Sequence, residues 1–387
     1  DIRTVVLPTA NTESTETNNN DTNTSSGSTD TSQNTVSTFN VNAAGNFLQT
    51  KQSSDGAIGS ASLYSDWAAI AIGSLGNSSA KSGLVNYLKT DPAAGTTATD
   101  YERRAMALLA LGINPYSGTP TNYIAEIMKK YDGTQFGDAG LVNDDIFALF
   151  PLLKSGYSIN DVEIQKAVAF ILSRQNGAGG WENPDLTAAA VQALSQVKSI
   201  GGVNDSLSRA RNYLKLNTKT DGRIGDNAFS TGWGLQALSA LGESVSNWNG
   251  SNPTPAQYLA SQQQIDGGVN ISTDSSDNRI WATSYALPGV QGKTWDMILI
   301  SVPKFTSHNP TGNSIADDTS TSTTSTTTQT VTSTPEIATS TTQFVTTTPE
   351  IISPTTTQTI APETIPELTL ETTEPTIELT EESIVDP

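Results

Sequence analysis

The chain has 387 residues, with 20 Lys and Arg against 39 Asp and Glu, one His and no Cys, and its formal net charge at pH 7 is −19. The lack of Cys excludes disulfides, thiolate nucleophiles and zinc sites built on thiolates. The acidity belongs to the two ends, because the first 40 residues carry five acids and Arg3 while the last 83 carry 12 acids and no Lys or Arg. The nearly neutral middle argues against nucleic acid as a partner, since phosphate binding needs a basic face.

Residues 1–40 consist mostly of Thr, Ser, Asn and Asp. Such a segment buries too little apolar surface to offset the entropy of ordering it, so we expect a disordered arm. The chain starts at Asp1 rather than Met, which we interpret as a processed or trimmed product. No apolar run approaches the ~20 residues that a membrane-spanning helix needs.

From about residue 41 to 305 the sequence repeats one unit six times: an amphipathic helix, a Gly-rich turn and a helix of small apolar residues. The period is roughly 40 to 45 residues, which is typical of helix-pair repeats. Glycine supplies the positive φ that the turns require where the chain reverses. The turns are expected at Asp55-Gly56, 92–95, Asp132-Gly133, Gly179-Gly180, Asp221-Gly222 and Asp266-Gly267.

The second helix of each unit has small apolar residues on every side, as in 67–75, 188–194 and 232–241. A helix of this kind is buried all round, whereas first helices such as 161–174 alternate apolar and charged positions and keep one wet face. Second helices should therefore form an inner ring inside an outer ring of first helices. Because neither end shows a polar capping repeat, we predict closure into an all-α (α/α)6 toroid over residues 41–305.

Residues 306–387 are rich in Thr, Pro, Glu and Ser. We expect them to form a disordered acidic stalk, which indicates a location outside the cell or at its surface. Attachment to the cell envelope would use segments that this chain does not contain. The single histidine, His308, lies at the start of the stalk and is interpreted as a linker residue rather than a ligand.

The fourth unit carries the most specific motif. Residues 166–181, which include Gln175 and end at Trp181, match in full the QW motif of squalene and oxidosqualene cyclases, and the runs around Phe47-Leu48 and Tyr213-Leu214 look like decayed copies. The chain thus resembles the terpenoid cyclase and protein prenyltransferase superfamily over residues 41–305. The resemblance implies a structural role for the motif, in which the Gln175 amide stacks on Trp181 and satisfies backbone groups at the end of a neighbouring helix.

Within that superfamily the chain is similar to bacterial secreted proteins with prenyltransferase/squalene-oxidase repeats, which are relatives of the cobalamin carriers transcobalamin and intrinsic factor. Residues 64–71, 99–103 and 280–288 carry this narrower likeness. It implies a carrier role, with cobalamin as a candidate ligand and no resident cofactor. The carriers hold cobalamin against a C-terminal β domain, and this chain has the Thr-rich tail in its place.

The N-terminal ends of the inner helices should meet at one mouth of the barrel and bring aromatic and acidic side chains to a central cavity. Acids at helix starts are also common caps, so both roles stay open for Asp66, Asp100, Asp145 and Asp185. The candidate ligand-binding residues are Trp67, Tyr101, Phe147, Glu182, Asp185, Trp233, Trp281 and Tyr285.

The catalytic candidates are Asp144 and Asp145. Class II terpene cyclases protonate an alkene or epoxide with an Asp-x-Asp-Asp motif and stabilise the carbocation with aromatic faces. Residues 142–145 resemble this motif except that Val142 replaces its first Asp, so Asp144 holds the proton donor's position without the carboxylate that supports it.

Three functions remain open on these residues. The favoured one is a secreted or cell-surface toroid that binds a hydrophobic or corrinoid small molecule, or a partner protein, without catalysis. The second is a terpene cyclase with a degenerate acid motif. The third is a polysaccharide-processing enzyme, because two carboxyl groups among Asp144, Asp145, Glu182 and Asp185 could flank a sugar. No metal site is predicted, and prenyltransferase chemistry is excluded because it needs Cys.

Overall fold

The computed structural model describes residues 38–244, 248, 253–270 and 273–305. Within these residues the protein is helical, with isolated β-bridges in several of the turns. The chain divides into two units, Asp1–Thr311 and Gly312–Pro387, and every described residue belongs to the first. Apart from residues 38–40, the predicted arms and His308 lie outside the described residues. No described helix has the length and apolarity needed to cross a membrane.

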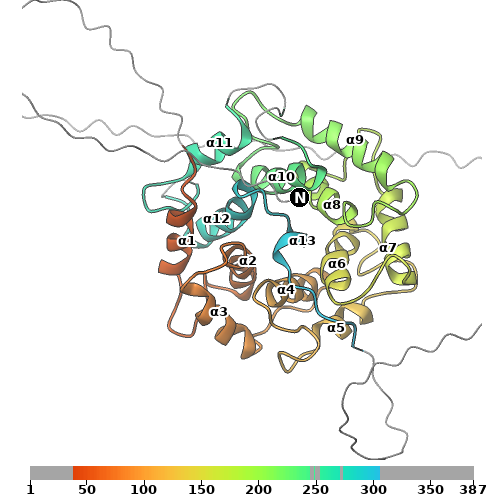
Figure 1. Ribbon diagram of the computed structural model, residues 1–387, viewed down its shortest axis with the longest axis horizontal. Coiled ribbons are helices and arrows are strands. Elements are labelled where there is room, and N and C mark those ends of the chain that lie inside the picture. Colours follow the sequence, from red (N-terminus) through yellow and green to blue (C-terminus); the bar gives the residue numbers. More distant parts are fainter. Residues whose placement is uncertain (1–37, 245–247, 249–252, 271–272, 306–387) are drawn as a thin grey trace, which may run out of the picture. The chain divides into compact units, whose positions relative to one another are not determined.

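The helices form two concentric rings (Figure 1). The outer helices are α1 (Val41–Thr50), α3 (Ala80–Lys89), α5 (Tyr123–Lys129), α7 (Val162–Ser173), α9 (Val203–Leu216) and α11 (Pro255–Gln262). The inner helices are α2 (Ser62–Gly73), α4 (Ala98–Ala110), α6 (Val142–Lys154), α8 (Pro184–Leu194), α10 (Ala228–Leu241) and α12 (Ser276–Val290). Each inner helix packs against the next, and α12 packs against α2. The predicted all-α toroid of six hairpins is confirmed.

The inner and outer helices differ in burial, as the sequence pattern predicts. Every residue from Ser65 to Ile72 of α2 is buried, and so is every residue from Leu186 to Leu194 of α8. In the outer helix α9 the buried residues recur every three or four positions, which leaves the opposite face to solvent. Small residues allow the inner helices to approach closely: a Cβ on Gly289 of α12 would lie 2.4 Å from the carbonyl oxygen of Gly232 in α10.

All inner helices run in the same direction, so the barrel has two distinct mouths. At the N-terminal mouth, the Ser60 N–H before α2 donates to Asp277 Oδ1 at the start of α12 (3.0 Å). At the C-terminal mouth, Gln291 Nε2 after α12 donates to Ser74 Oγ after α2 (2.8 Å). The starts of the inner helices therefore meet at one mouth, as predicted.

The turns inside the hairpins repeat one geometry. The six predicted turn glycines all have φ between 89° and 99°, which a residue with a Cβ rarely adopts: Gly56, Gly95, Gly133, Gly179, Gly222 and Gly267. Gln175 Nε2 donates to the carbonyl of Gly179 in its own turn (2.7 Å) and to that of Ser206 in α9 (2.9 Å). The turn of one hairpin is thereby tied to the outer helix of the next.

The QW residues meet backbone groups by donating hydrogen bonds. The Gln175 amide donates to two backbone carbonyls, one of them that of Ser206 near the start of the neighbouring helix α9. Trp181 is fully buried, and its indole N–H donates to the carbonyl of Ile171 (2.7 Å). The same glutamine position closes the ring, because Gln263 Nε2 donates to the carbonyl of Asn40 (2.9 Å) and its Oε1 accepts the Asn40 N–H (2.7 Å).

Gln263→Ala should lower the free energy of unfolding by about 1–3 kcal/mol, because it removes the hydrogen bonds that join α11 to α1 and leaves their backbone partners unpaired. Urea unfolding followed by circular dichroism measures the loss. Gln262→Ala is the matched control, since the Gln262 amide donates to the hydroxyl of the neighbouring Ser261 (3.2 Å) and does not join α11 to α1. Equal losses in the two variants would show that Gln263 does not hold the ring closed.

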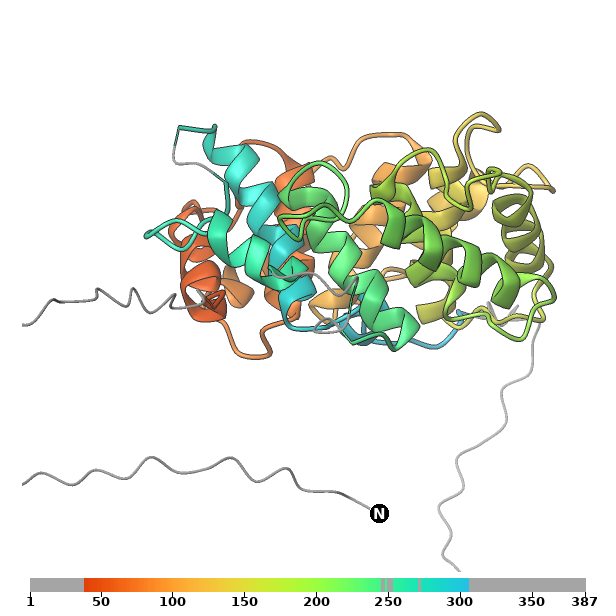
Figure 2. The ribbon, with the colours of Figure 1, turned by 90° about the horizontal axis from the view of Figure 1, so that it is seen from above.

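The C-terminal mouth is crossed by residues 291–305, here called the strap, which contains the short helix α13 (Trp295–Ile298) (Figures 1 and 2). Backbone groups of the strap bond to the C-terminal parts of four inner helices, α4, α6, α8 and α10. Gln236 Nε2 donates to the Lys293 carbonyl (2.9 Å), and the Val302 N–H donates to the carbonyl of Lys154 (2.8 Å). The Trp295 N–H donates to Gln192 Oε1 (3.1 Å). This crossing was not predicted from the sequence.

Candidate functional site

Six aromatic side chains meet at the centre of the barrel, and we call them the central cluster. They are Trp67, Phe147, Phe150, Trp233, Tyr285 and, from the strap, Trp295, and each is at most 8% exposed. Ring centroids lie 4.6 Å apart for Trp233 and Tyr285, 4.9 Å for Trp67 and Tyr285, and 5.1 Å for Trp233 and Trp295. These separations are those of aromatic rings in direct contact. The centre of the barrel is therefore packed with side chains.

Three half-buried aromatic residues lie between the central cluster and the N-terminal mouth, and we call them the aromatic mouth: Tyr64, Phe229 and Trp281. The Trp281 ring lies 5.7 Å from Phe229, 6.1 Å from Tyr64 and 5.9 Å from Tyr285 below it. The first turns of α2 and α10 and the first half of α12 supply these residues. They offer partly exposed aromatic surface to an apolar ligand.

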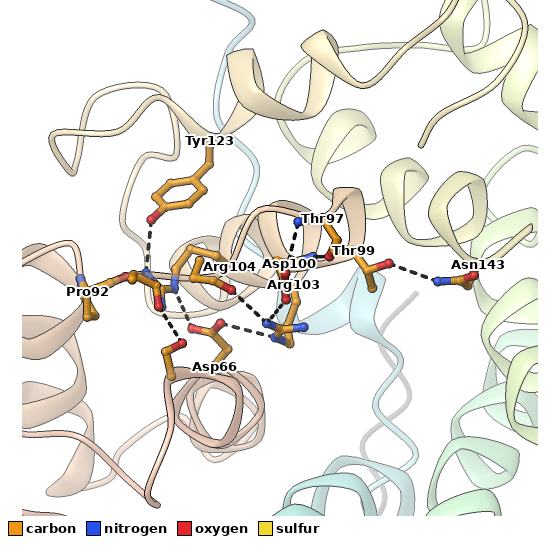
Figure 3. Close-up of polar contacts among 12 residues, drawn as sticks. Asp66, Pro92, Thr97, Thr99, Asp100, Arg103, Arg104, Tyr123 and Asn143 are labelled. Carbon is orange, nitrogen blue, oxygen red and sulfur yellow. Dashed lines mark hydrogen bonds and ion pairs between the residues drawn. The ribbon is translucent and has the colours of Figure 1, made fainter. Parts of the chain in front are cut away.

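A buried ion-pair network borders the mouth on the side of α2 and α4 (Figure 3). Asp66 Oδ1 accepts from Arg104 Nε (2.6 Å), Asp66 Oδ2 faces Arg103 Nε (3.4 Å), and Arg103 Nη2 reaches Asp100 (2.8 Å). Burial raises the pKa of Asp66, and the two guanidinium groups oppose that rise. Asp66 is therefore an ion-pair partner and no helix cap, whereas Asp100 completes a capping box with Thr97.

Asp144 lies in the first turn of α6 and is 4% exposed. Its Oδ1 accepts from the Thr99 hydroxyl (2.6 Å) and the Asn143 amide (3.1 Å), and its Oδ2 accepts from the Asp138 N–H (3.0 Å). Asp144 lines a cavity of about 690 Å³, here called the seam cavity, together with Thr96, Thr97, Ala98, Thr99, Lys129, Lys130, Gly137, Asp138 and Leu141. No aromatic side chain is among these lining residues.

Asp145 and Glu102 lie beside Asp144, between α4 and α6, and the three form what we call the acid seam. Burial, opposed by the Phe136 N–H and reinforced by Asp144, raises the pKa of Asp145 to about 7. Glu102 is fully buried, and neither of its carboxyl oxygens has a partner. Burial first, and then Asp144 and Asp145, raise the pKa of Glu102 well above its usual value. Glu102 therefore keeps its proton to a higher pH than an exposed glutamate does.

The position of Asp145 in the repeat explains why an acceptor is needed there. Its Oδ1 accepts the N–H of Phe136, the apolar residue of the preceding turn (3.0 Å). In four other hairpins a hydroxyl does this: Ser65 for Ile58 (2.9 Å), Thr187 for Trp181 (2.9 Å), Thr231 for Ile224 (3.1 Å) and Thr283 for Val269 (2.9 Å). Asp145 is thus an ionisable acceptor at a repeat position where these four other hairpins have a neutral hydroxyl. Its equivalent in the first hairpin is Ser65 and not Asp66.

The remaining sequence candidates are dispersed. Tyr101 belongs to α4 and faces α5, with its ring centroid 6.2 Å from that of Tyr123 and 5.5 Å from Lys130 Nζ. Glu182 is exposed in the turn before α8. Asp185 at the start of α8 is half-buried, and burial raises its pKa although Ser230 lowers it. Among the described residues no three acidic or His side chains are placed to hold a metal ion.

The structure thus brings together Trp67, Phe147, Trp233, Trp281 and Tyr285 from the predicted set. Three further groups were not predicted from the sequence: Glu102, Phe150 and Trp295. Trp295 and the apolar run of residues 297–300, which follow the last inner helix, were the available signal for the strap. No feature of the sequence indicated that Glu102 is buried, because a glutamate followed by two arginines is typical of a solvated helix face.

No protein-family model and no curated protein sequence matches the chain. Solved structures do match it. A variant of the type II terpene cyclase MstE from Scytonema, bound to its substrate geranylgeranyl dihydroxybenzoate, is 13% identical with a TM-score of 0.50, over 67% of this chain and 97% of that chain. Another MstE variant, bound to its product merosterolic acid A, is 12% identical with the same TM-score, over 65% and 95%.

Haptocorrin in complex with Cbi is 16% identical, over 69% of this chain and 71% of that chain, with a TM-score of 0.45. Identities this low establish likeness of fold and nothing about ligands or chemistry. The described part of the chain therefore has an α/α-toroid fold like that of the type II terpene cyclase MstE.

Proposed function

We propose that this chain is a binding toroid whose aromatic mouth captures an apolar small molecule without converting it. One observation carries the proposal: the central cluster fills the barrel, while Asp144 opens onto the seam cavity, which has no aromatic lining. A class II cyclase needs its acid and its aromatic faces in one cavity, because the acid creates the carbocation that the rings stabilise. In this chain the two lie in different places.

The chemistry of the mouth indicates the class of ligand. Tyr64, Phe229 and Trp281 offer apolar aromatic surface, and the Arg103–Asp100 pair lies at the start of α4 nearby. A hydrophobic chain or ring system with one polar end fits this combination. An isoprenoid alcohol is therefore the first probe, and a corrinoid is the second. The Thr-rich composition of the two arms supports a location outside the cell or at its surface.

A cyclase-like enzyme is the alternative, and two observations favour it. The fold is that of type II terpene cyclases, and Asp144 holds the motif's donor position with 4% of its surface exposed. Its partners are a hydroxyl, an amide and a backbone N–H. A carboxylic acid that donates a proton in the motif is instead supported by a second carboxylate, whose place Val142 takes here.

Trp281→Ala should weaken binding of geranylgeraniol about tenfold or more, because it removes the ring that contacts both other residues of the aromatic mouth. Equilibrium dialysis with the labelled alcohol, and separately with cyanocobalamin, measures the affinity. Phe305→Ala is the control, since Phe305 is a 66% exposed aromatic residue of the strap at the opposite mouth. Equal affinities of Trp281→Ala and wild type would place the ligand elsewhere.

A further inference from the structure

The acid seam is a buried cluster of carboxyl groups with too few partners. Glu102 and Asp145 have no exposed surface, and both Glu102 oxygens and Asp145 Oδ2 make no hydrogen bond. A buried carboxylate without partners is costly, whereas the protonated group costs far less. Loss of the proton from Glu102 or Asp145 consequently destabilises the closed fold.

The charged groups around the seam do not supply a neutralising cation. Arg103 is the cation that acts on Glu102, and it is already paired with Asp66 and Asp100. Asp100 also acts on Glu102, and Asp132 in the turn before α6 acts on Asp145, both with negative charge.

The lysines near the acid seam form hydrogen bonds or ion pairs with other groups. Lys130 Nζ donates to the carbonyl of Thr96 (2.8 Å), and Lys129 pairs with Glu126 (2.6 Å). Lys154, at the far end of α6, pairs with Asp296 of the strap (2.8 Å). Loss of protons from the seam would therefore place like charges side by side.

The repeat gives an independent reason to regard this seam as unusual. Four other hairpins satisfy the turn N–H with a neutral hydroxyl, which does not titrate, and only this hairpin of the compared set uses a carboxyl group. A threonine would serve the hydrogen bond without any ionisable group. The acid is consequently not needed for the fold itself.

We propose that Glu102 and Asp145 form a proton-operated latch between α4 and α6, which is closed when these two carboxyl groups are protonated and loosens when they lose their protons. Asp144 adjoins the latch and lines the seam cavity, so loosening changes the shape of that cavity. Thr99 and Gly137, which contact Asp144 and line the same cavity, would move with it. The device makes access to the seam cavity dependent on pH.

The direction of the pH effect follows from the protons. The carboxyl groups of Asp145 and Glu102 bind protons more tightly in the folded chain than in the unfolded chain. Their contribution to stability is fully present below the unfolded pKa of about 4 and is lost as pH rises through the folded pKa, which is about 7 for Asp145. The toroid should therefore be more stable at pH 5 than at pH 8.

Hydrogen exchange of the full chain, corrected for the intrinsic effect of pH, tests the latch directly. Between pH 5 and pH 8 the amides of 98–110 and 142–154 should lose protection about tenfold or more, while those of 203–216 and 228–241 should change less than about threefold. Glu102→Gln and Asp145→Thr remove the titrating groups and should abolish most of that difference. Asp205→Asn, an exposed acid on α9, should leave it unchanged.

Two results would overturn the latch. One is an equal loss of protection in all four segments, which would reflect general destabilisation by charge. The other is a wild-type pH dependence in Glu102→Gln combined with Asp145→Thr. If the variants unfold, the wild-type comparison of segments still decides between a local latch and a general effect.

Discussion

Trp295→Ala lowers the free energy of unfolding by about 3–5 kcal/mol, the largest loss that we expect from one side chain. Trp295 is 1% exposed, and its ring centroid lies 5.0 Å from that of Phe150, 5.1 Å from that of Trp233 and 5.5 Å from that of Phe147. The side chain therefore joins the strap to α6 and α10. Its removal leaves a cavity that the inner helices cannot fill, because each is packed on all sides.

Chemical unfolding followed by both fluorescence and circular dichroism measures this loss. Met297→Ala is the matched control, because Met297 belongs to the same helix α13 but is 64% exposed, and its loss should stay within about 0.5 kcal/mol. A small effect of Trp295→Ala would mean that the strap lies on the barrel without closing it. The central cluster would then be open at the C-terminal mouth.

Asp66→Asn lowers the free energy of unfolding by about 3–5 kcal/mol, because it leaves the fully buried guanidinium group of Arg104 without its counterion. Neither side chain has exposed surface, so water cannot replace the carboxylate. The Arg103 guanidinium would keep Asp100 as a partner. The remaining bonds of Arg104, to the Pro92 carbonyl (2.7 Å) and the Tyr123 hydroxyl (3.2 Å), carry no compensating charge.

A double-mutant cycle separates the ion pair from general packing. Combining Asp66→Leu with Arg104→Met should restore most of the stability, since apolar residues of similar size often replace a buried pair without loss. Glu126→Gln is the exposed comparison, because its partner Lys129 is 67% exposed, and it should cost no more than about 1 kcal/mol. Additive losses in the cycle would indicate that the two side chains act independently.

The ring could be predicted because its causes are local. Helical periodicity, a glycine in each turn and the motif ending at Trp181 all lie within one unit of the repeat, and repetition supplied the closure. The strap could not be predicted in this way, because residues 291–305 occur once and contact helices from five different hairpins. The repeat period of the sequence does not predict such a segment.

Residues of the candidate site could be predicted only where the same pattern, an inward position on an inner helix, recurs in every hairpin. Inward positions of the inner helices gave Trp67, Phe147, Trp233 and Tyr285, but their number alone did not say whether they line a cavity or fill it. That depends on ring-to-ring distances and on Trp295 from the strap. Asp145 was aligned with Asp66 by residue type, whereas its true equivalents are hydroxyl residues such as Thr187 and Thr231. Equivalent positions in the hairpins are therefore identified by the hydrogen bond that the side chain makes, rather than by its residue type.

The most direct test of a binding toroid without catalysis is to incubate the protein with squalene and with geranylgeranyl diphosphate and to analyse the recovered compounds by gas chromatography and mass spectrometry. We predict that any compound that binds is recovered unchanged, in wild type and in Asp144→Asn alike. A cyclised product that forms with wild type and disappears in Asp144→Asn would contradict this account and make the chain a cyclase.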